Sequence, residues 1–197
     1  MKIKVLNNFV VSKNHLGKAV FAARIFKKGD VITQFTGPRI HKSEIPTEYK
    51  GEEDRYVQIT KDYYLGPSGD IDDLINHSCD PNSGFKFTNS GVLLVALRQI
   101  EVGDEITWDY STTLLDSRWK MMCECNSEIC RKIIGDFMLL DAEVQNKYKD
   151  LDVLPQYVLE YMDSPEYDMY TKGIGILKHG KQNSTNTRYH HLLVKNY

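Results

Sequence analysis

The four cysteines are the side chains whose type and spacing point most directly to chemistry. Cys123, Cys125 and Cys130 lie together in the stretch "CECNSEIC", and Cys79 lies far upstream. Four thiolates suit one tetrahedral zinc ion. Such a site has no open position for water or substrate, so the pattern predicts a structural zinc. Its expected role is to tie the C-terminal part of the chain to a loop formed earlier.

Two disulfides are the main alternative for these cysteines, and unrelated buried thiols are another. Cys123 and Cys125 are too close in sequence to bridge without strain, and thiols stay reduced inside cells. The sequence shows no readable secretory signal and no apolar run near the roughly 20 residues that cross a bilayer. We therefore expect an intracellular location (cytoplasm, nucleus or nucleoid), with export into a host cell left open, and no membrane partner.

Composition and charge narrow the function classes further. The 197 residues are 41% hydrophobic and 26% charged, which is ordinary for one globular domain with or without a small appendage. A total of 25 basic and 27 acidic residues gives a net charge of −2. A zinc module for nucleic acid would need a basic stripe that this chain lacks, so no direct nucleic-acid partner is expected.

The elements that must position these cysteines are mainly short strands. Apolar segments separated by turn residues predict strands over residues 18–24, 30–36, 55–60, 62–66, 84–88 and 91–97. The polar stretch 37–55 contains Pro46 and Gly51 and is expected to be an inserted loop with one helical turn.

The chain changes character after the cysteine-rich stretch. Asp141 is placed to cap one helix and Pro155 to begin a second, with apolar residues at helical spacing. The last polar stretch, 178–197, is either a flexible tail or a final strand that needs a partner.

Three motifs together resemble a known family. They are "NHSCDPN" (76–82), "GDEITWDY" (103–110) and "CECNSEIC" (123–130), preceded by "GKAVFAARIFKKGDVI" (17–32). Their order and spacing are similar to the SET-domain protein-lysine methyltransferases that carry a cysteine-rich post-SET segment. The resemblance covers about residues 14–137, and its compactness is similar to bacterial or viral members.

The resemblance implies a mainly β fold with short helices. Small curved β-sheets would form a C-terminal pseudoknot in which residues 76–79 cross residues 106–110, stapled by one structural zinc. The implied organisation is a SET domain at 1–111, a post-SET zinc segment at 112–137, and a helical extension with a tail at 138–197.

The resemblance also implies S-adenosylmethionine as cofactor. The cofactor-binding positions would be Gly17, Lys18, Ala19, Asn76, His77 and Tyr110. Ala19 stands where a second glycine is usual. Asp73 stands where many members have an arginine, so that arginine's role is not transferred. An alternative for Asn76 and His77 is that they only satisfy buried backbone groups.

Tyr110 and Tyr56 are the implied catalytic residues, and together with Trp108 they would line the lysine channel. Tyr110 as a plain core aromatic is the alternative. Trp108 stands where many members carry the Phe or Tyr that tunes the number of methyl groups, so the degree of methylation stays open. Ile133, Ile134 and Phe137 either cover the cofactor and channel or belong to the core.

The expected function is methyl transfer from S-adenosylmethionine to a lysine of a protein substrate. Histone-like and ribosomal proteins are candidate substrates, and the oligomeric state is open. The alternative is a catalytically silent SET-fold module that binds a protein partner. The intact Tyr110 and "NHSC" motif favour activity.

Overall fold

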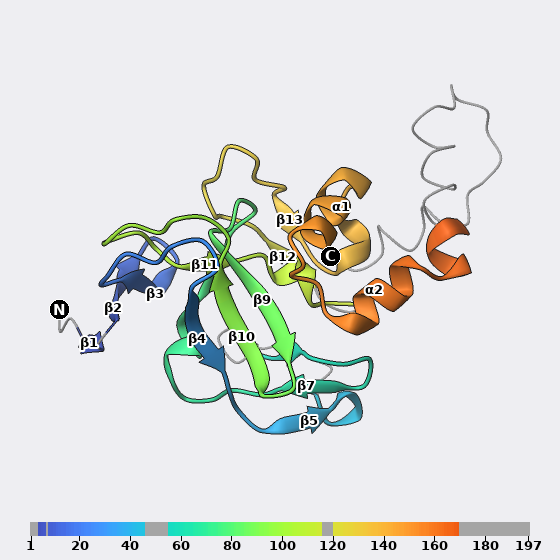
Figure 1. The fold of residues 1–197 in the computed structure, drawn as a ribbon, viewed down its shortest axis with the longest axis horizontal. Helices are drawn as coiled ribbons and strands as arrows, with labels where there is room; N and C mark the ends of the chain where they lie inside the picture. The colour runs from blue at the N-terminus through green and yellow to red at the C-terminus, as the bar shows by residue number, and fades with distance from the viewer. Residues whose placement is uncertain (1–3, 7, 46–54, 116–119, 170–197) are drawn as a thin grey trace. The chain divides into compact units, whose positions relative to one another are not determined.

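A computed structural model describes residues 4–6, 8–45, 55–115 and 120–169 (Figure 1). The chain divides into two units, residues 1–160 and 161–197, and every predicted site residue belongs to the first. The predicted tail at 178–197 lies outside the described residues. The predicted domain boundaries at residues 111 and 137 stay a prediction.

The first unit is built from short strands, as the sequence predicts. The strands are β1 (Lys4–Leu6), β2 (Phe9–Asn14), β3 (Gly17–Ala22), β4 (Val31–Phe35), β5 (Arg39–His41), β6 (Val57–Gln58), β7 (Tyr63–Leu65), β8 (Asn76–His77), β9 (Ser83–Thr88), β10 (Gly91–Ala96), β11 (Thr107–Trp108), β12 (Met121–Met122) and β13 (Ile133–Ile134). They form three-stranded sheets β1-β2-β3, β4-β10-β9 and β5-β7-β6, and two-stranded sheets β11-β8 and β12-β13. The predicted mainly β fold class is confirmed.

In the described residues the helices are few and short. They are α1 (Ala142–Asp150), α2 (Gln156–Met162) and the 3-10 helices Lys42–Glu44, Ile71–Leu74, Tyr110–Thr112 and Phe137–Leu139. Asp141 is the N-cap residue of α1 and Pro155 immediately precedes α2, so both predicted helix starts are correct. Strand β5 was not predicted in the polar stretch 37–55, but that stretch does contain the predicted helical turn. Residues 46–54 lie outside the described part.

The parallel pair β8 and β11 is the crossing that the resemblance implied. Asn76 pairs with Thr107, and His77 pairs with Trp108. The Ser78 N–H extends the pairing by donating to the Trp108 carbonyl at 3.1 Å. Parallel strands need a long connection, and here the β9–β10 hairpin lies within it.

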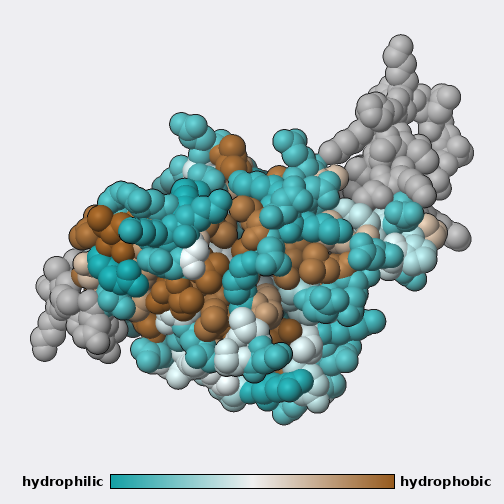
Figure 2. Space-filling view, viewed as in Figure 1, coloured by the Kyte–Doolittle hydropathy of each residue, from teal (hydrophilic) through white to brown (hydrophobic). Residues whose placement is uncertain are grey.

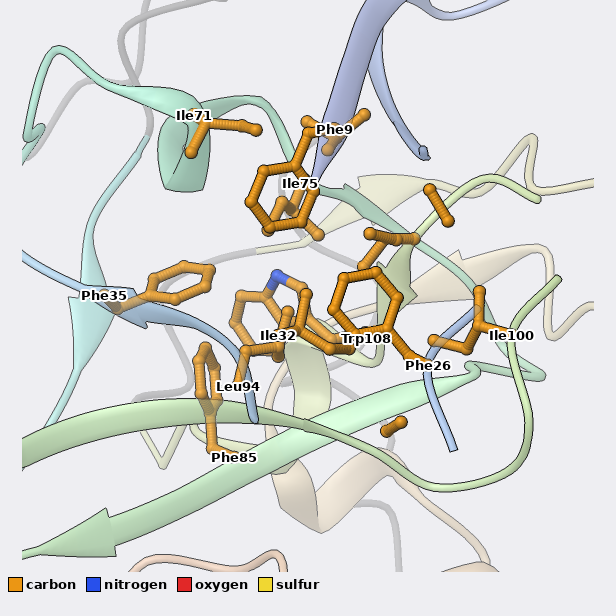
Figure 3. Close-up of a cluster of buried hydrophobic side chains, with 14 of the residues drawn as sticks. Phe9, Phe26, Ile32, Phe35, Ile71, Ile75, Phe85, Leu94, Ile100 and Trp108 are labelled. Atoms are coloured by element: carbon orange, nitrogen blue, oxygen red, sulfur yellow. The ribbon is translucent and has the colours of Figure 1, made fainter. Parts of the chain in front are cut away.

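Trp108 anchors this crossing in the main hydrophobic core. Its indole lies at the middle of the cluster in Figure 3 and is only 5% exposed. The indole lies 4.5 Å from the Phe85 ring and 6.1 Å from the Phe35 ring, centroid to centroid. Close-packed cores respond to small volume changes. A substitution that changes the volume of a side chain in this core is therefore expected to disturb the pairing of β8 with β11.

On the face shown in Figure 2, apolar surface lies in patches among hydrophilic residues. Such patches are usual on a folded protein. Among the described residues, no helix is both long enough and apolar enough to cross a membrane.

Candidate functional site

Tyr110 begins a 3-10 helix directly after β11. Its hydroxyl donates to the Ile75 carbonyl at 2.9 Å, and its ring lies 4.7 Å from that of Trp108. A phenol has one proton to donate. Because that proton is committed to Ile75, the Tyr110 oxygen can enter a further hydrogen bond only as an acceptor.

The structure brings Tyr56, Trp108 and Tyr110 to one cavity of about 80 Å³. Tyr56 immediately precedes β6, so its place follows from the pairing of β6 with β7. Arg55 and Asp73 also line the cavity, with 3.9 Å between the guanidinium and the carboxylate. Asp73 mainly holds its own loop, because it accepts the Ser68 and Gly69 N–H groups. The cavity therefore combines aromatic and aliphatic walls, which suit an alkyl chain, with charged groups at Arg55 and Asp73.

The predicted cofactor residues come together from two strands. The Asn76 side-chain amide donates to the Lys18 carbonyl at 3.1 Å and thereby joins the start of β3 to β8. Gly17 has a φ of +113°, which a residue with a side chain rarely adopts, and a Cβ there would meet no atom within 4 Å. Ala19 does not need glycine's freedom: it has no positive φ, and its methyl group is fully buried.

The four cysteines form one cluster without disulfides. The Cys79 and Cys123 sulfurs lie 3.7 Å apart, and the Cys79 N–H donates to the Cys125 sulfur at 3.5 Å. The Cys130 thiol donates to the Cys123 carbonyl at 3.6 Å. Ile134 is buried within the cluster, and Tyr110 packs against it. The cysteine cluster is therefore a neighbour of the predicted catalytic tyrosine.

His77 is a fifth candidate metal ligand, which the sequence pattern assigned only to the cofactor. The ligand atoms of His77, Cys79, Cys123 and Cys125 all lie within 4.8 Å of one another. However, the Tyr110 N–H donates to His77 Nδ1 at 3.2 Å. A backbone N–H is always a donor, so Nδ1 accepts and the ring proton lies on Nε2. That nitrogen is 3.3 Å from the Cys79 sulfur and is placed to donate to it.

The pKa values of these groups show which of them would lose a proton when a cation binds. Burial lowers the pKa of His77 to about 4, so the ring is neutral at pH 7. Burial raises the pKa of Cys79 to about 11 and that of Cys123 above its usual range. For Cys125, burial is outweighed by hydrogen bonds from Cys79 and Ser127, and the pKa falls to about 6. Zinc binds thiolates and releases the protons of such thiols, so the donor set fits zinc.

Asp109 joins three separate parts of the chain. Its fully buried carboxylate receives two hydrogen bonds from the Arg131 guanidinium, at 2.8 and 2.7 Å, and one from the Tyr148 hydroxyl at 2.8 Å. Burial and the Asp109 charge raise the pKa of Tyr148 well above its usual range, which keeps the hydroxyl protonated. The Arg131 N–H in turn donates to the Cys79 sulfur at 3.4 Å. The segment holding Tyr110, the cysteine-rich segment and α1 are thus connected through one carboxylate.

Sequence reasoning missed Asp109, Arg131 and Tyr148. Asp109 carried a readable signal, because an aspartate before a short helix is a typical N-cap, and its side chain accepts the Ser111 N–H. Tyr148 carried no such signal, because no local sequence pattern relates it to Asp109, which lies 39 positions away.

The three apolar residues after the cysteines divide between core and surface. Ile134 and Phe137 are buried at 1% and 0% exposure, whereas Ile133 is 43% exposed. Ile134 and Phe137 therefore belong to the core, whereas Ile133 lies at the surface.

A comparison with protein-family models identifies a known domain in this chain. The SET domain family model matches residues 17–111. The chain contains a SET domain. This match ends beside Tyr110 and leaves the cysteine-rich segment and α1 outside it.

Curated relatives share part of the sequence. The probable histone-lysine N-methyltransferase set-23 of Caenorhabditis briggsae is 28% identical over 64% of this chain and 59% of its own length. The histone-lysine N-methyltransferase ASHR3 of Arabidopsis thaliana is 32% identical over 64% of this chain and 27% of its own length. The chain thus spans less than two thirds of either relative. Both are eukaryotic, and the expected likeness to bacterial or viral members stays a prediction.

Solved structures agree on the fold. The methyltransferase domain of human SETMAR superposes with a TM-score of 0.53 at 19% identity, covering 63% of this chain and 56% of that one. The structure of KRYPTONITE in complex with mCHG DNA and SAH gives a TM-score of 0.52 at 22% identity, covering 61% of this chain and 27% of that one. The predicted SET fold is therefore confirmed.

Replacing Arg131 by alanine tests the Asp109 network. The Arg131→Ala variant leaves a buried carboxylate without its cation and is expected to lower the free energy of unfolding by about 3–5 kcal/mol in urea denaturation. Lys42→Ala, which removes an exposed ion pair with Asp62, is the control and should unfold nearly like the wild type. Equal, small effects of both variants would contradict the network's importance.

Proposed function

We propose that this SET domain transfers a methyl group from S-adenosylmethionine to the side-chain amine of a lysine in a protein substrate. The observation that carries the proposal is the cavity shared by Tyr56, Trp108 and Tyr110. It lies beside the crossing of β8 and β11, where Asn76 meets Lys18. The names of the relatives, histone-lysine methyltransferases, agree with this reaction class.

The cofactor supplies an electrophilic methyl group on a sulfonium. The chain must hold a neutral amine in line with it, whereas free lysine has a pKa of about 10.4. Burial of the amine away from water and the adjacent sulfonium charge both disfavour the ammonium form, so the proton passes to water without a dedicated base. The Tyr110 oxygen accepts one amine N–H, which turns the nitrogen lone pair toward the methyl group. With the cofactor bound, the N–C bond would form as the C–S bond breaks, and the surplus proton would leave the amine for solvent.

Orientation is the chain's main contribution to the rate. Tyr110 is held by its bond to Ile75 and by packing against Trp108. Preset geometry of this kind lowers the barrier by removing the cost of aligning the reactants. The buried indole of Trp108 forms a rigid wall, because Phe85 packs behind it. We expect histone-like and ribosomal proteins, which are rich in lysine, among the substrates.

We further propose that residues 112–137 act as a post-SET segment that binds one structural zinc ion through Cys79, Cys123, Cys125 and Cys130. The Nε2–H of His77 donates to the Cys79 sulfur instead of occupying a ligand position. This supports a closed site with a hydrogen bond to one thiolate.

Removing the Tyr110 hydroxyl tests the reaction. Wild-type protein is expected to transfer tritiated methyl groups onto a panel of histones and ribosomal proteins. The Tyr110→Phe variant should lower kcat about a hundredfold, because the amine loses its acceptor. Tyr63→Phe removes a hydroxyl that does not line the cavity and should leave kcat unchanged.

One result would contradict the enzymatic proposal directly. A wild-type preparation that binds S-adenosylmethionine but methylates nothing in the panel would contradict the enzymatic proposal. It would favour the silent partner-binding module.

Zinc content tests the ligand set. Metal analysis of the wild type and of His77→Gln should give about one zinc per chain. Cys130→Ser should give well below one, because it removes a thiolate ligand. Zinc retained in Cys130→Ser but lost from His77→Gln would instead make the histidine the fourth ligand.

A further inference from the structure

Glu105 holds two asparagines that come from distant parts of the chain. The Asn14 amide donates to both carboxylate oxygens, at 2.9 and 2.8 Å. The Asn76 amide donates to one of them at 2.9 Å. The Asn14 oxygen accepts the Leu16 N–H at 2.7 Å, so the same cluster shapes the turn that leads to Gly17. Glu105 thus connects both groups of predicted cofactor residues.

This cluster fixes which way the Asn76 amide faces. Its NH₂ group has two protons, and both have acceptors: Glu105 and the Lys18 carbonyl at 3.1 Å. A flipped amide would place its oxygen against two other acceptors and is excluded. Within the described part of the chain no donor is bonded to the Asn76 oxygen. That oxygen is therefore the atom presented to a ligand, and it accepts only N–H or O–H groups.

The Glu105 charge has no cation beside it in the described residues. Among the described residues, no lysine, arginine or histidine nitrogen lies within 4.0 Å of a Glu105 carboxylate oxygen, which is the limit for an ion pair. The carboxylate is nevertheless half-buried. A partly desolvated carboxylate favours a nearby positive charge. By contrast, the buried Asp109 has its own arginine. Of the two carboxylates near the crossing, Asp109 therefore has a cation within the described residues and Glu105 does not.

We propose that Glu105 is a positioning residue for a primary ammonium group on the ligand of this site. It locks the Asn76 oxygen toward that ammonium and supplies the negative charge that favours it. The proposal rests on the proposed function, in which the ligand is an adenosyl sulfur compound with an amino-acid end. It assigns the recognition of that end to Glu105 acting through Asn76.

A binding cycle with Glu105→Gln tests this role. Affinities of the zinc-loaded protein are measured by calorimetry for S-adenosylhomocysteine and for its analogue that lacks the amino group. The wild type should prefer S-adenosylhomocysteine about tenfold, as expected for a charge-assisted hydrogen bond. The variant should lose most of this preference while binding the analogue as the wild type does. Glu101→Gln, which removes an exposed carboxylate bonded to Gln99, is the control and should keep the preference.

The outcomes separate this inference from the proposed function. Equal wild-type affinities for the two compounds would overturn the ammonium role without any variant. Equal weakening of both compounds by Glu105→Gln would show that the residue only supports the fold and would also overturn it. A folded wild type that binds neither compound would instead refute the proposed function. Zinc content and thermal unfolding of each variant show that the compared proteins are folded.

Discussion

The buried carboxylate of Asp109 is the constraint on which the arrangement of the site depends. A charge without solvent must be matched, and Arg131 and Tyr148 match it from two other parts of the chain. Tyr110 follows Asp109 directly, and Arg131 follows Cys130. The position of the predicted catalytic tyrosine is therefore coupled to the cysteine cluster and to α1, although the matched SET family segment ends at residue 111.

The crossing of β8 and β11 contributes residues both to the hydrophobic core and to the candidate site. Trp108 fills the core on one side and lines the cavity on the other, while His77, its partner in the pairing, contacts the Tyr110 N–H and the Cys79 sulfur. The core therefore holds the wall of the cavity rigid. The cysteine cluster adds a second fixed point, because Tyr110 packs against it.

Local patterns in the sequence were enough to predict most of the longer strands and the helix starts, but the six-residue strand β2 was missed. Apolar segments between turn residues marked strands such as β9 and β10, and Asp141 and Pro155 marked where the two helices begin. The cysteine spacing predicted a cluster that the structure brings together. Short strands such as β5 carry too few residues to show a period. The bond from Tyr148 to Asp109 and the tautomer of His77 depend on single contacts between distant residues, which leave no periodic signal in the chain.

The central claim is that the closed cysteine segment holds Tyr110 in its productive position. The most direct measurement is methyl transfer by one preparation before chelation, after removal of zinc, and after its return. The account predicts that transfer falls at least about tenfold on removal and recovers with about one equivalent of zinc. Undiminished transfer by folded, zinc-free protein would contradict it.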